Sequence, residues 1–162
     1  MGIRGIIRDI REFFMTRIVN RQISRDYQIL DTFEAGMHLI GAEVKSIKGG
    51  RMSLAGAFVK IIGSEIYLVN AEIFPYPFAR PEGYQTRRSR KLLLHKREIL
   101  NLKIKMGSSN LTLVPLECYT THGFIKLKIG LAKGKKAYEK RDELKKRDLQ
   151  REIQREFRGK IK

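Results

Sequence analysis

Apolar and polar positions alternate along much of the chain between residues 26 and 131, and turn residues interrupt the alternation at short intervals. Ile125 and Leu127, for example, alternate with the cations Lys126 and Lys128. A period of two is typical of a β-strand, because successive side chains of a strand point to opposite faces of the sheet. The pattern therefore predicts a sheet with one apolar face and one face that carries basic groups.

Two pairs of these segments are close enough in sequence to form hairpins. The expected hairpins are residues 58–62 with 65–69, joined by Gly63 and Ser64, and residues 111–121 with 124–131, joined by His122 and Gly123. Glycine suits such two-residue links because it adopts positive φ without a steric penalty. Residues 95–106 have helical spacing instead, with Ile99, Leu102 and Met106 on one side. Many short strands and a packed helix predict a mainly β fold with flanking helices, in the form of a small oligonucleotide-binding (OB) barrel.

Residues 3–19 show a second helical pattern, with isoleucines and phenylalanines on one side and arginines on the other. A docking or surface helix, a membrane anchor and a transit peptide would all give this pattern. Asp9 and Glu12 argue against a transit peptide, and no small-residue cleavage site follows, as a secretory signal would require. We interpret residues 1–19 as an amphipathic N-terminal extension, and Met15 is an alternative start of translation.

The composition changes after Gly130. Residues 133–162 contain thirteen basic and six acidic residues around a thin apolar seam. Such a segment buries too little apolar surface to offset the entropy of ordering, which is ~1–2 kcal/mol per residue. We expect a basic C-terminal tail that is disordered or helical and that gains order on an anionic partner. Residues 20–132 are then the barrel domain.

The charge of the chain indicates its class of partner. Lys and Arg total 34 against 17 acidic residues, a net charge of +17 on 162 residues. This excess favours a polyanion, with nucleic acid as the first candidate and an anionic membrane as the second. No apolar run approaches the ~20 residues of a membrane-spanning helix, so we expect no membrane. The single cysteine, Cys118, can form no internal disulfide, and we expect a buried thiol in the cytoplasm.

Candidate catalytic groups show none of the patterns that catalysis requires. The groups considered are Asp26, Asp31, Glu34, Glu43, His38, His95 and His122. The carboxylates form no dense acidic motif that would hold magnesium, and the histidines lack metal-ligand spacing and a nearby nucleophile. No glycine-rich phosphate loop precedes a helix. We therefore predict no enzymatic activity, no metal and no cofactor.

Two segments combine cations with aromatic rings, as RNA-binding surfaces do. Residues 20–27 place Arg21 and Arg25 close to Tyr27, although a solvated linker with Tyr27 in the core is an alternative. Residues 75–91 form a connection that is long for a compact domain and carries five cations. A mobile solvated loop is the alternative there.

Three blocks of sequence resemble the small protein B family, the SsrA-binding proteins. They are FEAG at 33–36 with GAEVKSIKGGR at 41–51, RSRKLLLH at 88–95 with Glu98 and Ile99, and LTLVPL at 111–116 with IGLAKGKK at 129–136 and YEKR at 138–141. Their order and spacing are similar to those of the family over about residues 19–158.

The resemblance implies an OB barrel with flanking helices that binds the tRNA-like domain of transfer-messenger RNA (tmRNA, SsrA) in the bacterial cytoplasm. Members of this family deliver tmRNA to ribosomes stalled on messages without a stop codon, which is ribosome rescue by trans-translation. The protein body stands in for a missing anticodon arm. The basic tail becomes helical in the empty message channel, next to the small-subunit decoding region. We therefore expect tmRNA and the ribosome as partners of a monomeric chain.

Site residues follow from the resemblance by position. The expected tmRNA-binding residues are Asn20, Arg21, Arg25, Glu34, Leu94 and His95, with Lys45, Arg88, Arg90 and Lys91 added on charge. The expected ribosome-binding tail residues are Lys133, Gly134, Lys135, Lys136, Tyr138, Glu139, Lys140 and Arg141. Family members commonly have Tyr at the position of Arg25 and Asp at the position of Glu139. An arginine can still stack on a base and Glu139 keeps the charge, so we expect activity to be retained.

Other classes of protein remain as alternatives. A generic ribosome-associated or RNA-chaperone OB protein would explain the charge but would not require the block at 134–141. A nuclease would need metal-dependent cleavage. An interfacial membrane protein would use residues 3–19.

Overall fold

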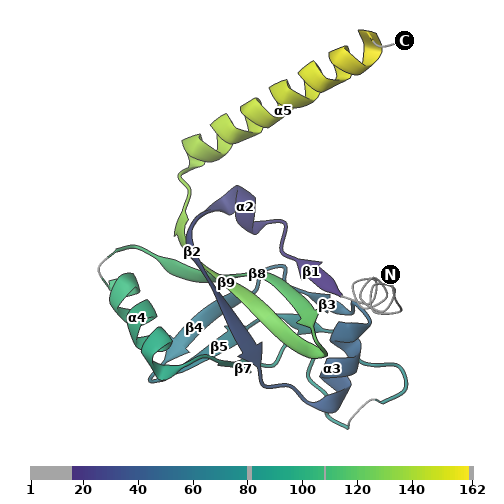
Figure 1. Ribbon diagram of the computed structural model, residues 1–162, viewed down its shortest axis with the longest axis vertical. Helices are drawn as coiled ribbons and strands as arrows, with labels where there is room; N and C mark the ends of the chain where they lie inside the picture. The colour runs from purple at the N-terminus through teal and green to yellow at the C-terminus, as the bar shows by residue number, and fades with distance from the viewer. Residues whose placement is uncertain (1–15, 80–81, 108, 161–162) are drawn as a thin grey trace, which may run out of the picture.

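Antiparallel strands form the body of the protein, and helices lie around it (Figure 1). The computed structural model describes residues 16–79, 82–107 and 109–160. Within them the strands are β1 (Arg17–Val19), β2 (Tyr27–Met37), β3 (Met52–Ser53), β4 (Phe58–Ile62), β5 (Glu65–Val69), β6 (Glu72–Ile73), β7 (Arg90–Leu93), β8 (Thr112–Thr121) and β9 (Phe124–Gly134). The helices are α2 (Ile23–Asp26), α3 (Gly41–Lys48), α4 (Lys96–Gly107) and α5 (Ala137–Lys160).

The main sheet closes on itself. Its strands follow the order β1-β8-β4-β5-β7-β2-β9, and β9 also pairs with β8. This additional pairing joins the strands from β8 to β9 into a ring, to which β1 is added beside β8. Strands β3 and β6 form a separate short pair. A closed sheet leaves few unpaired edges, which is how small barrels avoid aggregation. The predicted mainly β fold with flanking helices is confirmed.

Both predicted hairpins form. Strands β4 and β5 pair along their whole length around Gly63, whose φ is 62°. Strands β8 and β9 pair around His122 and Gly123, whose φ values are 48° and 82°. Tight two-residue turns need positive φ at a central residue, which is why glycine is favoured there. The turns fix the register, and the register decides which side chains of each strand face inward.

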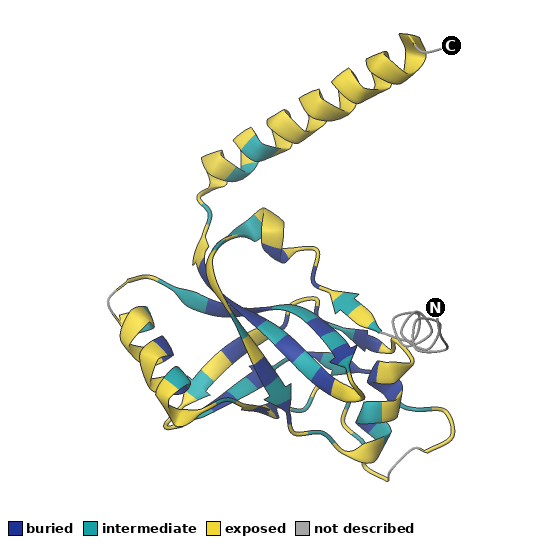
Figure 2. Cartoon of the chain, in the orientation of Figure 1, coloured by how far each residue is buried: buried dark blue, intermediate teal, exposed yellow. Residues whose placement is uncertain are grey.

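The interior of the ring is filled by the apolar face of each strand (Figure 2). Leu68, Leu113 and Leu127 have no exposed surface. The predicted helix forms as α4 and contributes Leu102 to this core, and α3 contributes Ile47. Such side chains each stabilise the fold by ~1.5–3 kcal/mol on burial. The alternation of apolar and polar positions therefore places the cations of β9 outside the ring, as predicted.

Cys118 lies in this interior and has no exposed surface. Burial raises the pKa of its thiol to about 12. A neutral, buried thiol acts as a small apolar side chain, because only the thiolate is an effective nucleophile. The prediction of a buried thiol is confirmed.

The helix predicted for residues 3–19 is wrong for its last three residues. Residues 3–19 were expected to be helical, but Arg17–Val19 is the strand β1 and pairs with β8. Ile18 and Val19 are β-branched, and β8 offers them an edge to pair with, so tertiary pairing overrides the helical spacing. The sheet therefore begins at Arg17 rather than at residue 20. Residues 1–15, which include Met15, lie outside the described residues.

Of the two states expected for the C-terminal tail, disordered or helical, the structure shows the helical one. Helix α5 has no buried residue and extends away from the body (Figures 1 and 2). Strand β9 continues to Gly134, two residues beyond the predicted end of the barrel at residue 132. None of the described helices is long and apolar enough to cross a membrane.

Candidate nucleic-acid interface

The residues predicted to bind RNA lie in three separate groups on the body. Glu34, Lys91, Leu94 and His95 line one cavity between β2, β7 and the start of α4. Asn20, Arg21 and Arg25 precede or lie in α2. Lys45, Arg88 and Arg90 lie on or beside α3. The structure therefore brings only part of the predicted face together.

The cavity group surrounds an open depression of about 680 Å³. Glu34 is exposed on β2 and accepts a hydrogen bond from the Tyr119 hydroxyl on β8. Lys91 Nζ lies 2.6 Å from Glu65 Oε1, and this cation lowers the pKa of Glu65. Lys126 of β9 also lines the depression. Cations, carboxylates and a partly apolar floor thus meet on the outer side of the sheet.

His95 stands at the beginning of α4. Its backbone N–H donates to Glu98 Oε2 at 2.9 Å, so Glu98 satisfies one of the unpaired amides of the helix start. The His95 side chain is exposed, and Leu94 before it is half-buried. Both residues therefore lie on the rim of the depression.

The depression offers each kind of contact that RNA recognition uses. Carboxylates such as Glu34 accept hydrogen bonds from base edges and ribose 2′-hydroxyls, and lysines such as Lys126 bind phosphate. An imidazole and a leucine side chain can pack on a ribose or a base.

The second group is only partly at the surface. Asn20 is buried, and its Nδ2 donates to the Leu54 and Pro115 carbonyls at 3.0 and 3.2 Å. This amide nitrogen is committed to the protein and fixes the segment that leads into α2. Arg21 and Arg25 are exposed, so they are the members of this group that can reach an anion. Tyr27 is half-buried and packs against the core residues Ile23 and Ala132. The alternative interpretation, in which the Tyr27 ring belongs to the core, therefore holds.

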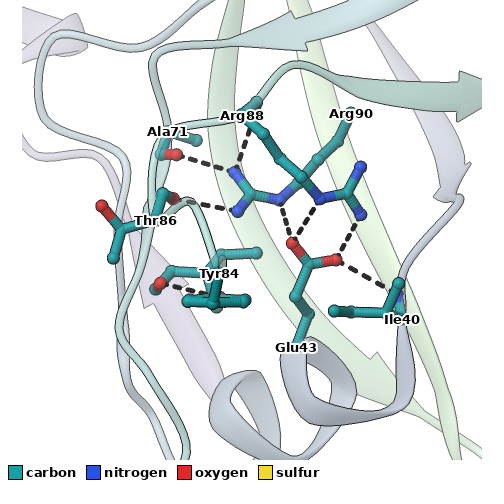
Figure 3. A network of polar contacts seen from close by, with 8 residues as sticks. Ile40, Glu43, Ala71, Tyr84, Thr86, Arg88 and Arg90 are labelled. Atoms are coloured by element: carbon teal, nitrogen blue, oxygen red, sulfur yellow. Dashed lines mark hydrogen bonds and ion pairs between the residues drawn. The ribbon is translucent and has the colours of Figure 1, made fainter. Parts of the chain in front are cut away.

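In the third group, Lys45 is exposed on α3, whereas Arg88 and Arg90 belong to a buried ion network rather than to a free surface (Figure 3). Glu43 of α3 has no exposed surface. Its Oε1 accepts from Arg88 Nε at 2.8 Å and from Arg90 Nε at 2.9 Å. Its Oε2 accepts from Arg88 Nη2 at 2.6 Å and from the Ile40 backbone N–H at 3.1 Å. Four donors therefore converge on one carboxylate, which is how a buried charge avoids a desolvation penalty of several kcal/mol.

Arg90 is a correction to the predicted RNA face. Its side chain has no exposed surface, so it cannot contact RNA without unfolding of this region. Besides the bond to Glu43, it donates to the carbonyls of Ala71, Arg88 and Thr86 at 2.8–3.0 Å. Charge alone suggested a surface role, but the apolar alternation of β7 points Arg90 inward beside Glu43.

The network also sets the electrostatics of Glu43. Burial alone would raise the pKa of its carboxyl, but the bonds from Arg88, from the Ile40 amide and from Arg90 outweigh burial and lower the pKa. The carboxylate therefore stays ionised through the physiological range. Tyr84 lies beside the network and donates from its hydroxyl to the Ile73 carbonyl at 2.9 Å. Together these bonds tie the end of the long connection from Phe74 to Ser89 onto α3.

The base of the tail is clasped to α2. Lys135 Nζ lies 2.9 Å from the Ser24 carbonyl and 2.6 Å from Glu143 Oε2, and this cation lowers the pKa of Glu143. Lys140 Nζ lies 3.3 Å from Asp26 Oδ1. Glu139 accepts from the Lys136 backbone N–H at 2.9 Å, so the longer side chain at this position still caps the start of α5.

The other predicted tail residues divide between strand and helix. Lys133 and Gly134 are exposed at the end of β9, and Tyr138 and Arg141 are exposed on α5. Lys136 Nζ lies 6.0 Å from the centroid of the Tyr138 ring. Apart from the clasp, α5 presents its cations to solvent, where they are accessible to an anionic partner.

Tyr119 and Lys126 were missed by the sequence interpretation. They face each other in the register of β8 and β9, and each lines or supports the depression that contains Glu34. Burial and, after it, the hydrogen bond to Glu34 raise the pKa of Tyr119 to about 12. The alternation of β9 already placed Lys126 on the outer face. Only the pairing of β2, β8 and β9 could reveal that Tyr119 touches Glu34.

Metal-ligating side chains do not gather in the part of the chain that the structure describes. Among those residues no three of His, Cys, Asp or Glu are close enough to hold an ion. The carboxylates of interest, Glu34 and Glu43, have a tyrosine and two arginines as partners instead.

A small closed sheet that carries cations on its outer face is typical of oligonucleotide-binding proteins. The sequence profile of the SmpB protein family matches residues 17–159 of this chain. The chain therefore belongs to the SmpB protein family.

Individual relatives agree with this assignment. The SsrA-binding protein of Elusimicrobium minutum is 47% identical over 143 residues, which are 88% of this chain and 91% of the relative. The SsrA-binding protein of Sulfurihydrogenibium sp. is 48% identical over 143 residues, 88% of this chain and 94% of the relative. A chain of the solved structure "tmRNA-SmpB: a journey to the center of the bacterial ribosome" is 44% identical, with a TM-score of 0.63 over 75% of this chain and 86% of that one.

Proposed function

We propose that this protein binds the tRNA-like domain of tmRNA and delivers it to stalled ribosomes for trans-translation. The observation that carries the proposal is membership of the SmpB family over residues 17–159, among relatives named SsrA-binding proteins. The similar solved chain comes from a work on tmRNA, SmpB and the bacterial ribosome. The net charge of +17 suits both RNA partners.

The depression around Glu34 is the part of the body best suited to tmRNA. Glu34 is held by Tyr119, and Lys126, Leu94 and His95 lie around it. A fixed carboxylate next to exposed cations gives both a specific contact and a phosphate contact, whereas cations alone give affinity without selection. Arg21 before α2 and Arg25 in α2 add two exposed cations, and α2 lies near the point where the tail leaves the body (Figure 1).

Helix α5 has a different task in this proposal. It carries cations and no core, so it is suited to an anionic channel and not to a folded partner surface. The clasp at Lys135 and Lys140 sets the direction in which α5 leaves the body. The body would therefore hold tmRNA while the tail acts on the ribosome.

Further properties follow from this function. We expect binding without catalysis and without a metal or cofactor, a monomeric chain, and residence in the cytoplasm, where ribosomes are found.

A gel-shift titration tests the proposal. The purified protein should bind tmRNA in the presence of an excess of bulk tRNA. Glu34→Ala should weaken binding, and Glu65→Ala, which removes a carboxylate from the same depression without touching Tyr119, is a matched control. If bulk tRNA displaced tmRNA at equal concentration, the protein would be a general RNA binder, the alternative of a ribosome-associated or RNA-chaperone OB protein.

A further inference from the structure

The segment after β6 presents aromatic side chains to solvent. Phe74 is 42% exposed and Phe78 is 88% exposed, although both are large apolar residues. The ring of Tyr76 meets that of Phe78 edge to face, with centroids 5.6 Å apart and planes at 65°. We call Phe74, Tyr76 and Phe78 the aromatic tip. Tyr76 itself is half-buried and supports Phe78. Neighbouring exposed rings such as Phe74 and Phe78 are a common mark of a binding surface, because leaving large apolar groups in water is unfavourable.

The aromatic tip is held in place by α3 and the turn that follows it. Lys45 Nζ of α3 lies 5.4 Å from the centroid of the Tyr76 ring. The Phe74 backbone N–H donates to the Arg51 carbonyl at 3.1 Å. The far end of the same connection is fixed by the Glu43 network. A ring that is fixed before binding loses less entropy when a ligand stacks on it.

The surroundings of the aromatic tip are basic. Lys45 and Lys48 of α3 and Arg51 after it are exposed, whereas Glu43, the acidic residue of α3, is buried and bound by two arginines. Exposed rings among cations form the platform on which proteins stack unpaired bases, with the cations on the phosphates. A protein partner of equal size would need acidic groups to match these cations. Charge and rings together favour unpaired RNA.

The position of the aromatic tip separates it from the candidate tmRNA face. Helix α3 lies on one side of the closed main sheet, and α4, which follows His95, lies on the other side (Figure 1). An RNA domain seated on the depression at Glu34 and His95 therefore leaves the α3 side open to the second RNA partner. We propose that the aromatic tip stacks on unpaired bases of ribosomal RNA. The choice of ribosomal RNA as the partner rests on the proposed function, whereas the stacking of unpaired bases on the aromatic tip does not.

Short RNAs test the chemistry alone. Binding of a ten-nucleotide oligouridine and of a ribose-phosphate oligomer of equal length without bases is measured by fluorescence anisotropy. Phe78→Ala should weaken oligouridine binding by ~5-fold or more, since one stacked base contributes about that factor. Binding of the oligomer without bases should not change. Phe124→Ala removes another exposed ring, 69% exposed at the β8–β9 turn, and should change neither.

Ribosomes and tmRNA identify the partner. In the Phe78→Ala variant, tmRNA affinity should stay within about twofold of wild type, and binding of the tmRNA-loaded protein to stalled ribosomes should fall by ~5-fold or more. An equal loss on both oligomers, an equal loss for tmRNA, or unchanged ribosome binding would each overturn the inference. Failure of the wild-type protein to bind tmRNA would instead overturn the proposed function, while the oligomer measurement would still report on the aromatic tip.

Discussion

Replacement of Glu43 by Gln should destabilise the fold more than any exposed charge change. The substitution keeps the shape of the side chain but converts one of its two oxygens to an NH₂ group. Each oxygen of Glu43 accepts two hydrogen bonds, so two of the four donors would face another donor. The buried Arg90 charge would also lose its counter-ion.

The magnitude follows from these contacts. Loss of one partner of a buried ion pair costs ~3–5 kcal/mol. We expect the lower end, about 3 kcal/mol, because Arg88 is 31% exposed and can turn to water, and because Arg90 keeps three carbonyl partners. In a chain of this size that change corresponds to a drop of roughly 6–12 °C in melting temperature.

Urea and thermal unfolding followed by circular dichroism measure this cost. The control is Glu65→Gln, which removes an exposed ion pair with Lys91 and should cost at most ~1 kcal/mol. A cost for Glu43→Gln as small as that of the control would refute the assignment of Glu43 as the anchor of the long connection.

Further outcomes are expected from the same contacts. The fold lowers the pKa of the Glu43 carboxyl from 4.5, so its contribution to stability is complete above that value and is lost as the pH falls through the lower folded pKa. The free energy of unfolding should therefore depend less on pH between about 5 and 3 in Glu43→Gln than in wild type. His95→Asp should weaken tmRNA binding in a gel shift and leave the melting temperature nearly unchanged, since the side chain is exposed; a matching loss of stability would make it structural. The affinity for tmRNA should fall by roughly two to three decades between 50 and 200 mM salt if four to six counterions are released, and a flat dependence would contradict an electrostatic interface. Cys118 should react with a thiol reagent at pH 8 only as fast as the protein opens, and prompt labelling of the native protein would show that the ring is not closed around it.

Most of the fold could be predicted from local sequence patterns. The hairpins around Gly63 and His122 were predictable because strand alternation and turn residues act within a few positions of each other. β1 was not predictable, because its pairing partner β8 lies about a hundred residues away and decides against the local helical spacing. The order of the strands, and with it the closure between β8 and β9, likewise depends on contacts between distant segments.

The interface was predictable only as a set of residue types. Cations in a basic chain were all expected at the surface, but Arg90 is buried because Glu43 lies opposite it across α3 and β7. Nothing local to Arg90 distinguishes it from Lys91, which points the other way and is exposed. Tyr119 was missed for the corresponding reason: its contact with Glu34 exists only in the folded register.

The tail can be removed without cutting the sheet if the chain ends after Lys136, because β9 stops at Gly134 and the Lys135 backbone N–H and side chain still reach Asp26 and Ser24. Reconstituted tagging of chains on stalled ribosomes, with tmRNA affinity measured on the same preparation, is the most direct test of a body that holds tmRNA and a tail that acts on the ribosome. We predict nearly unchanged tmRNA affinity and no tagging. Loss of tmRNA binding on this truncation, or tagging at the wild-type rate, would contradict the proposed division between body and tail.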